Sequence, residues 1–433
     1  MKLPMLLAAT AVFSGAAFSQ AAGPFETPPE QPPDASLTAS EINGAGFKIQ
    51  SPVGSDGLMH HYVVESRFGN FPAYGHAALV TRLREVAALQ VLANTKDSDV
   101  VVKAVGRGVK EDVGTVAQVA RNPVKTVFGI PRGIGHLLGG YRAQVQETTR
   151  KAGEAVHTSG SEPRADVAAH VTQQSVHVAK QYADRYLGLS AAERRWYAQL
   201  GVNPYTTNEV LRKAVTRLAK IDAVTSLGMR FAPVGIPFAG EAKRALDAIY
   251  NESPAVLRKR RREALAGFGL TPAEVEQFEN TLLLDPTRQT LLVNDVQALN
   301  GVEGRAELLR HAMSVTTEDE IEVFMQSAAL LIRSHARQPL MRILAGPRVP
   351  AGQRADGRVV VFGSFDAVYW TQDVAGYAAA VHAQMPASVT GREVWLGGLV
   401  SPRARTELER LGWTVHDRAE ETLADPTTRA PLS

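Results

Sequence analysis

Helix-start signals recur through the middle of this chain, and they constrain its fold more than any other feature. Three of them place a hydroxyl three residues before a glutamate, which is the spacing of a capping box. Two others place a capping side chain directly before a proline, which is favoured at the first helical position. The five signals are Ser190-Ala-Ala-Glu193, Ser253-Pro254, Thr271-Pro-Ala-Glu274, Asp285-Pro286 and Thr317-Glu-Asp-Glu320. They predict a helical domain over residues 167–340.

The pattern changes after residue 340, where short apolar runs alternate with helix-like segments. The segments in chain order are a strand at 358–363, a helix at about 371–385, a strand at 393–397, a helix from Ser401-Pro402, and a strand at 412–416. Strands that alternate with helices at this spacing favour a parallel sheet. We therefore predict a small α/β unit over residues 341–420 and a polar tail over 421–433.

The region before the helical domain carries a different signature. Residues 47–51 and 61–66 alternate apolar and polar side chains, and turn residues lie between them at 54–57. This pattern predicts a small antiparallel β element, followed by helix from about Leu79. We place this element and amphipathic helices in residues 41–150, and a linker at 151–166.

These parts together predict a mixed, mainly α fold: a central helical domain with a small N-terminal antiparallel β element and a C-terminal α/β unit. Of the 433 residues, 45% are hydrophobic and only 6% are aromatic, which favours helix packing over a large β-sandwich. The chain contains no cysteine, so disulfides, thiolate metal sites and cysteine nucleophiles are excluded.

The first residues predict export. A lysine precedes an uncharged stretch from Leu3 to Phe18, and small residues follow, as in a secretory signal peptide. We assign the signal peptide to residues 1–21 and a Pro-rich linker to 22–40. A periplasmic location is the interpretation we prefer, with secretion as the alternative. The mature chain has no second apolar run long enough for a transmembrane helix.

One basic amphipathic stretch stands out at residues 100–146. Apolar or small residues recur there about every 3.6 residues, and seven basic residues against two acidic ones give it a charge of +5, against +3 for the whole chain. A stripe of this kind suits an anionic membrane surface, an envelope partner protein or packing on the protein's own core. The residues predicted to make membrane or partner contact are Lys103, Arg107, Lys110, Lys125, Val127, Ile130, Arg132 and Ile134.

The histidines do not predict a metal site. His60 and His61 are adjacent and point to opposite faces of a strand, while His170 and His177 lie two helical turns apart. No cofactor or metal ion is therefore expected. Nucleic acid is not an expected partner either, since the chain is exported and its net charge is close to balanced.

A ligand site is the hypothesis for the carboxyl ends of the C-terminal strands, where open parallel sheets bind ligands. The candidate residues there are Ser364, Asp366, Gly397, Gly398, Ser401 and Arg403. Helix capping explains Ser401 equally well.

The sequence thus favours an exported, envelope-associated binding or scaffold protein that touches lipid or a partner through residues 100–146. The alternative is a periplasmic enzyme, such as a hydrolase, with its site at these strand ends. The absence of a complete catalytic motif favours the first interpretation.

Overall fold

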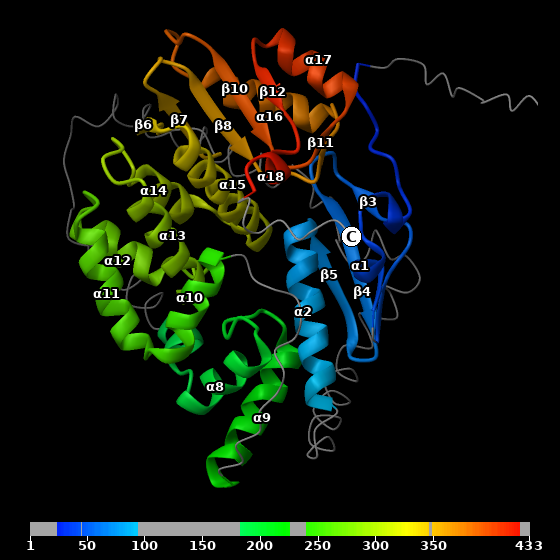
Figure 1. Cartoon of the computed structure of the whole chain (residues 1–433), viewed down its shortest axis with the longest axis vertical. Coiled ribbons are helices and arrows are strands. Elements are labelled where there is room, and N and C mark those ends of the chain that lie inside the picture. The colour runs from blue at the N-terminus through cyan, green and yellow to red at the C-terminus, as the bar shows by residue number, and fades with distance from the viewer. Residues whose placement is uncertain (1–23, 45, 94–181, 226–239, 346–348, 425–433) are drawn as a thin grey trace, which may run out of the picture.

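The computed structural model describes residues 24–44, 46–93, 182–225, 240–345 and 349–424 (Figure 1). The predicted signal peptide, the amphipathic stretch 100–146 and the linker 151–166 lie outside the described residues. The predicted fold class is confirmed: the described chain is mainly helical, with an antiparallel N-terminal sheet and a C-terminal sheet flanked by helices.

The N-terminal sheet is built around β4 (His60–Ser66), which pairs antiparallel with three neighbours. The other strands are β1 (Asn43–Gly44), β2 (Phe47–Ile49), β3 (Gly54–Ser55) and β5 (Gly69–Tyr74). The long helix α2 (His76–Ala93) lies along this sheet (Figure 1) and buries Leu79, Leu83 and Val86 against it. Their spacing of three or four residues puts them on one face of the helix.

The Pro-rich segment predicted as a linker is instead packed against this sheet. Gln31 pairs with Val53 through two backbone hydrogen bonds of 3.0 and 2.8 Å. Pro33, in the short 3-10 helix Pro33–Ala35, and Leu37 are both buried. A proline-rich segment can pair at a sheet edge through a residue between its prolines, as Gln31 does here, which composition alone does not reveal. The short α1 (Ala39–Ile42) follows with a capping box.

The predicted helix starts are confirmed at all five positions. A short π-helix, Ala183–Leu187, precedes the series. The helices are α8 (Ala191–Leu200), α9 (Glu209–Thr225), α10 (Gly240–Asn251), α11 (Pro254–Ala266), α12 (Pro272–Asn280), α13 (Pro286–Ala298), α14 (Glu307–Ser314) and α15 (Glu318–Arg337). Three clusters divide them. Helices α8 and α9 share the core of the N-terminal sheet, α11 to α15 surround a second core, and α10 packs in a smaller third cluster with Tyr182, Tyr186 and Leu257.

The C-terminal sheet has the strand order β12-β10-β8-β7-β6, and the three predicted strands are its parallel members. Its strands are β6 (Leu340–Ile343), β7 (Ala351–Arg354), β8 (Val359–Gly363), β10 (Arg392–Leu396) and β12 (Thr414–His416). Three helices connect or follow these strands: α16 (Gln372–Ala383), α17 (Pro402–Arg410) and α18 (Ala419–Thr422). Two short strands, β9 (Ala367–Val368) and β11 (Leu399–Val400), pair with each other outside this sheet.

Both faces of this sheet are covered, as the alternation along β8 shows. Val359 and Val361 pack with α16 and α17, while Val360 and Phe362 pack with α15 and the helical core. The antiparallel strands β6 and β7 were not predicted, because Ala351-Gly-Gln-Arg354 has neither the length nor the apolar pattern of a strand. Among the described residues, the helices are too short or too polar to cross a membrane.

Candidate functional site

The strand-end residues predicted as a ligand site lie where the C-terminal sheet meets the N-terminal sheet. Asp366 follows β8, and its two carboxylate oxygens each accept a backbone hydrogen bond, from the amide of His60 at 2.9 Å and from that of His76 at 3.1 Å. His76 is the first residue of α2, so Asp366 satisfies a free amide at that helix end. The carboxylate thereby joins two sheets that are about 300 residues apart in sequence.

The glycines of the predicted site serve the same junction. A Cβ atom on Gly398 would lie 1.9 Å from the carbonyl oxygen of Asp366, so the two backbone segments approach too closely for any other residue. The amide of Gly397 donates to the carbonyl of Gly363 at 2.8 Å. Close packing of neighbouring backbone segments therefore accounts for both glycines.

The two serines are also bonded within the protein. Ser364 Oγ donates to Glu420 of α18 at 2.7 Å. Ser401 Oγ donates to Glu26 at 2.6 Å and accepts from the amide of Ala404 as the cap of α17. Arg403 lies in the first turn of α17 and is half-buried. We call this set the strand-end junction: Ser364, Asp366, Gly397, Gly398 and Ser401.

The histidines beside the strand-end junction are held in internal contacts. His60 is buried, and its ring nitrogens lie 3.0 Å from the Tyr62 hydroxyl and 3.0 Å from the Gln31 amide. Burial lowers the pKa of His60, against the opposing effect of the Asp366 carboxylate. His61 points away from His60 toward Asp56. Within the described ranges, no group of three acidic or histidine side chains is arranged to hold a metal ion.

The basic run at 258–262 divides between a buried and a solvated side. Arg261 is buried and pairs with the fully buried Glu279, which also binds Arg258 at 3.0 Å. Lys259 and Arg262 are exposed. The run is therefore in part a structural ion-pair network, which the density of positive charge in the sequence does not indicate.

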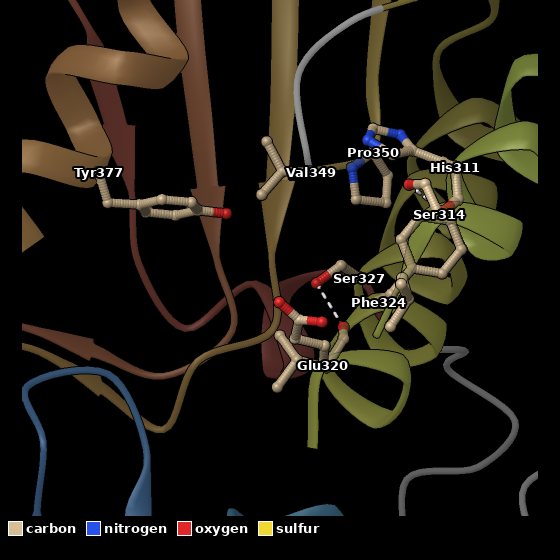
Figure 2. Close-up of a pocket in the computed structure, with 10 residues that line it drawn as sticks. His311, Ser314, Glu320, Phe324, Ser327, Val349, Pro350 and Tyr377 are labelled. Atoms are coloured by element: carbon tan, nitrogen blue, oxygen red, sulfur yellow. Dashed lines mark hydrogen bonds between the residues drawn. The ribbon is translucent and has the colours of Figure 1, made fainter. Parts of the chain in front are cut away.

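Two of the hollows in the described part of the chain lie against α15. One is a small pocket between α14, α15 and α16, with a mainly apolar lining that also includes Glu320, Ser327 and Tyr377 (Figure 2). The other is a cleft of about 420 Å³ bounded by the end of β5, α2, the loop 202–207, α13 and the first turns of α15. The N-terminal part, the helical part and the loop between α8 and α9 all contribute to this cleft, which we call the junction cleft.

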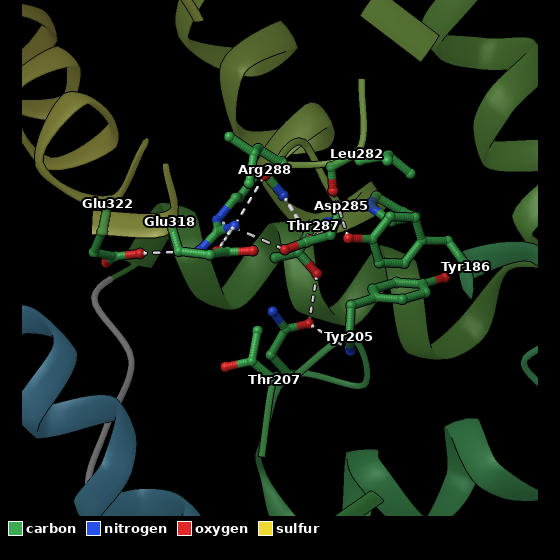
Figure 3. A network of polar contacts seen from close by, with 12 residues as sticks. Tyr186, Tyr205, Thr207, Leu282, Asp285, Thr287, Arg288, Glu318 and Glu322 are labelled. Atoms are coloured by element: carbon green, nitrogen blue, oxygen red, sulfur yellow. Dashed lines mark hydrogen bonds and ion pairs between the residues drawn. The ribbon is translucent and has the colours of Figure 1, made fainter. Parts of the chain in front are cut away.

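One wall of the junction cleft is organised by Arg288 (Figure 3). Its guanidinium lies 2.7 Å from Glu318, 3.5 Å from Glu322 and 3.7 Å from Asp285. Burial alone would lower the pKa of Arg288, but the three carboxylates raise it above its ordinary value. Asp285 caps α13 by accepting from the amides of Thr287 and Arg288, so this wall is fixed by the helix end that the sequence predicts.

The opposite wall is organised by the buried Glu85 of α2. Glu85 accepts hydrogen bonds from Arg82 at 2.7 Å, from Asn208 at 3.2 Å and from Thr206. Arg82 also donates to Thr207 at 2.9 Å. These bonds hold the loop 202–207 against α2, and Thr287 binds the same loop from the other side through Asn203 at 2.8 Å.

The junction cleft carries excess negative charge. Five carboxylates against three guanidinium groups give its lining a formal charge of −2. The charged residues are Glu85, Asp285, Glu318, Asp319, Glu322, Arg82, Arg84 and Arg288. Because side chains of both signs line a hollow of ligand size, the cleft has the volume and the charged groups to hold a small polar molecule. Sequence reasoning missed it, since Asp285 and Glu318 were interpreted only as helix-start residues.

No family model, no curated protein and no solved structure matches this chain.

Proposed function

We propose that this chain is an exported, envelope-associated protein that binds a small polar ligand in the junction cleft. The observation that carries the proposal is the convergence on one hollow of α2, the loop 202–207, α13 and α15. A ligand there would contact elements from distant parts of the sequence, which is the usual arrangement of binding sites between structural units.

The charge of the cleft specifies the chemistry of the ligand. A lining of formal charge −2 favours a cation, and the acceptor oxygens of Glu318 and Glu322 suit ammonium groups. Arg288 limits the attraction, because it already pairs with both carboxylates. We therefore propose a small organic polycation that shares these carboxylates with Arg288.

Isothermal titration calorimetry with spermidine tests this proposal. We expect saturable binding of one spermidine per chain that Glu322→Gln weakens by about fivefold, or about 1 kcal/mol. The matched control is Glu209→Gln, on the exposed face of α9, which should leave the affinity unchanged. Equal binding by Glu322→Gln and the full chain, or an absence of saturable binding, would refute the cleft as the ligand site.

Membrane contact through residues 100–146 remains a separate proposal, because that stretch lies outside the described residues. Its support is the basic amphipathic pattern of the sequence alone. Flotation with anionic and neutral liposomes tests it, with Val127→Asp/Ile134→Asp as the variant. Flotation on anionic vesicles that the variant loses would support membrane contact, and no flotation of either protein would oppose it.

The hydrolase alternative loses support from the strand-end junction. Both oxygens of Asp366 and the hydroxyls of Ser364 and Ser401 are bonded to neighbouring parts of the same chain. A catalytic role would require these bonds to break or rearrange.

A further inference from the structure

A third hollow shares Tyr205 and Thr206 with the junction cleft, but its other walls come from the segment 186–189, α8 and α9. It has a volume of about 180 Å³, and its lining is mainly polar. Tyr186, Tyr197 and Tyr205 all line it, so we call it the tyrosine pocket. Figure 3 shows the rings of Tyr186 and Tyr205 next to each other, with their centroids 5.7 Å apart.

The carboxylate of Glu193 is the acidic group of the tyrosine pocket, and the protein itself nearly satisfies it. Ser190 donates to Oε2 from its amide at 2.9 Å and from its hydroxyl at 2.8 Å, and Thr216 donates to Oε1 at 2.7 Å. Burial would raise the pKa of Glu193, but these bonds and the charge of Lys220 lower it. A carboxylate has about four lone-pair positions, so one position on Oε1 is left for a further donor.

The hydroxyl of Tyr197 is the polar group that the protein leaves without a partner. Tyr197 is only 2% exposed, and its hydroxyl forms no hydrogen bond within the described residues. By contrast, Tyr186 donates to the carbonyl of Leu282 at 2.6 Å, and Thr206 donates to Glu85. An unpaired hydroxyl in a protein interior costs free energy and is rare. We therefore infer that a group from outside the chain bonds to Tyr197.

Arg212 supplies positive charge to the same pocket. It is exposed, and its guanidinium forms no ion pair within the described part of the chain. Burial raises the pKa of Tyr197, and the charge of Arg212 opposes that rise, so the two groups are close together. A guanidinium presents paired N–H donors whose geometry matches a carboxylate. A ligand with a carboxylate could therefore pair with Arg212 and reach the Tyr197 hydroxyl.

We propose that the tyrosine pocket binds one sugar ring that carries a carboxylate, which is a uronic acid. Its carboxylate pairs with Arg212, one ring hydroxyl accepts from Tyr197, and another donates to Oε1 of Glu193. The mainly polar lining favours a hydroxylated ligand over one with an alkyl chain. The pocket volume equals that of about six water molecules in the liquid, which suits one sugar ring and not a chain of rings.

The test is calorimetric titration of the full chain with D-glucuronate, D-glucose and D-glucosamine, which have similar size and different charge. We expect D-glucuronate to bind at least about tenfold more tightly than D-glucose, and D-glucosamine not to bind. Equal affinity for D-glucuronate and D-glucose, or tighter binding of D-glucosamine, would overturn the pairing of a carboxylate with Arg212. No binding of any of the three would overturn the site itself.

A pair of tyrosine variants separates binding from stability. Tyr197→Phe removes a hydroxyl that has no partner in the free protein, so it should weaken D-glucuronate binding at least about fivefold without lowering the urea midpoint. Tyr186→Phe is the matched control, because it loses the bond to Leu282 and should lower the urea midpoint while leaving the affinity unchanged. Unchanged affinity of Tyr197→Phe would overturn the proposal, whatever its stability.

A second pair of variants tests the charge. Arg212→Gln should reduce the affinity for D-glucuronate to that for D-glucose, whereas Lys213→Gln, at an exposed lysine paired with Glu209, should not change it. An equal loss in both variants would indicate general charge attraction and would overturn the assignment to Arg212. Because Glu322 lies outside this pocket, Glu322→Gln should bind D-glucuronate normally, and the result is independent of the spermidine experiment.

Discussion

The strand-end junction and the junction cleft contain the same kinds of side chain and use them in opposite ways. At the strand-end junction, both carboxylate oxygens of Asp366 accept hydrogen bonds from backbone amides of the N-terminal part. In the cleft, Glu318 and Glu322 pair with Arg288 but keep 39% and 27% of their side chains exposed. In the first region the polar side chains bond the two parts of the chain together. In the second region a hollow lies between the parts, and the carboxylates that line it remain partly exposed to solvent.

The largest expected loss of stability is at Gly398, whose backbone packs directly against that of Asp366 in the strand-end junction. Gly398→Ala should destabilise the protein by about 3 kcal/mol, the upper end of the usual range for overpacking, because the new Cβ collides with a backbone oxygen that no rotamer change can move. Gly376→Ala, on α16 with open space around it, is the control and should be neutral or stabilising. Urea unfolding followed by circular dichroism measures both, and equal stability of the two variants would contradict the close approach.

Asp366 provides the next test, since it is the link between the two sheets. Asp366→Ala leaves the amides of His60 and His76 without a partner and should cost about 1–3 kcal/mol. Asp366→Asn keeps one acceptor oxygen and should cost less. Urea midpoints of the two variants decide the matter. A destabilisation by Asp366→Ala of less than about 0.5 kcal/mol would mean that the strand-end junction is not a structural contact.

For the junction cleft we expect a substitution to change ligand affinity and to leave the stability of the fold nearly unchanged. Glu322→Gln should change the free energy of unfolding by less than about 0.5 kcal/mol, because the side chain is partly exposed and its pair with Arg288 is long at 3.5 Å. The same variant should lose spermidine affinity. A loss of stability comparable to that of Asp366→Ala would place Glu322 among the structural contacts and remove the contrast between the two regions.

The smallest effect concerns pH and the pair of His76 with Glu41, which lie 2.8 Å apart at the edge of the strand-end junction. This hydrogen bond lowers the pKa of Glu41 from 4.5 to about 2, and it raises the pKa of His76 above 6.5. The Glu41 contribution is present above pH 4.5 and is lost as the pH falls toward 2. The His76 contribution is present below pH 6.5 and is lost as the pH rises through the raised value.

The pair therefore stabilises the fold most between pH 4.5 and 6.5. The difference in Tm between the full chain and His76→Gln should be largest in that window and should shrink on both sides. Comparison with the variant is needed because the lowered pKa of the buried His60 destabilises the fold in acid independently. A Tm difference that does not vary with pH would show that the pair makes no contribution.

Local signals predicted the elements of this fold well. The capping hydroxyls of Ser190, Thr271 and Thr317 and the run Val359–Phe362 each depend on neighbours within a few residues, so their pattern is visible in the sequence. The strands β6 and β7 carry no such pattern. β7 pairs along the edge of β8, and β6 pairs in turn with β7, so both strands depend on neighbours in the sheet.

The sites depended on contacts between distant residues and were harder to predict. The candidates at 364–366 and 397–401 do gather at one edge, as parallel strands require, but the sequence gives no sign that His60, His76 and Glu26 bond to them there. The cleft is assembled from α2, the loop 202–207 and α15, which no local motif connects. Buried ion pairs such as Arg261–Glu279 are hidden for the same reason.

Hydrogen–deuterium exchange of the full chain with and without spermidine tests the central contrast most directly. If the cleft is the ligand site, spermidine should slow exchange in residues 82–85, 202–208 and 318–326, and exchange around residues 364–366 and 397–401 should not change. Protection at the strand ends, with none at α15 and the loop 202–207, would contradict the account and return the ligand site to the C-terminal sheet.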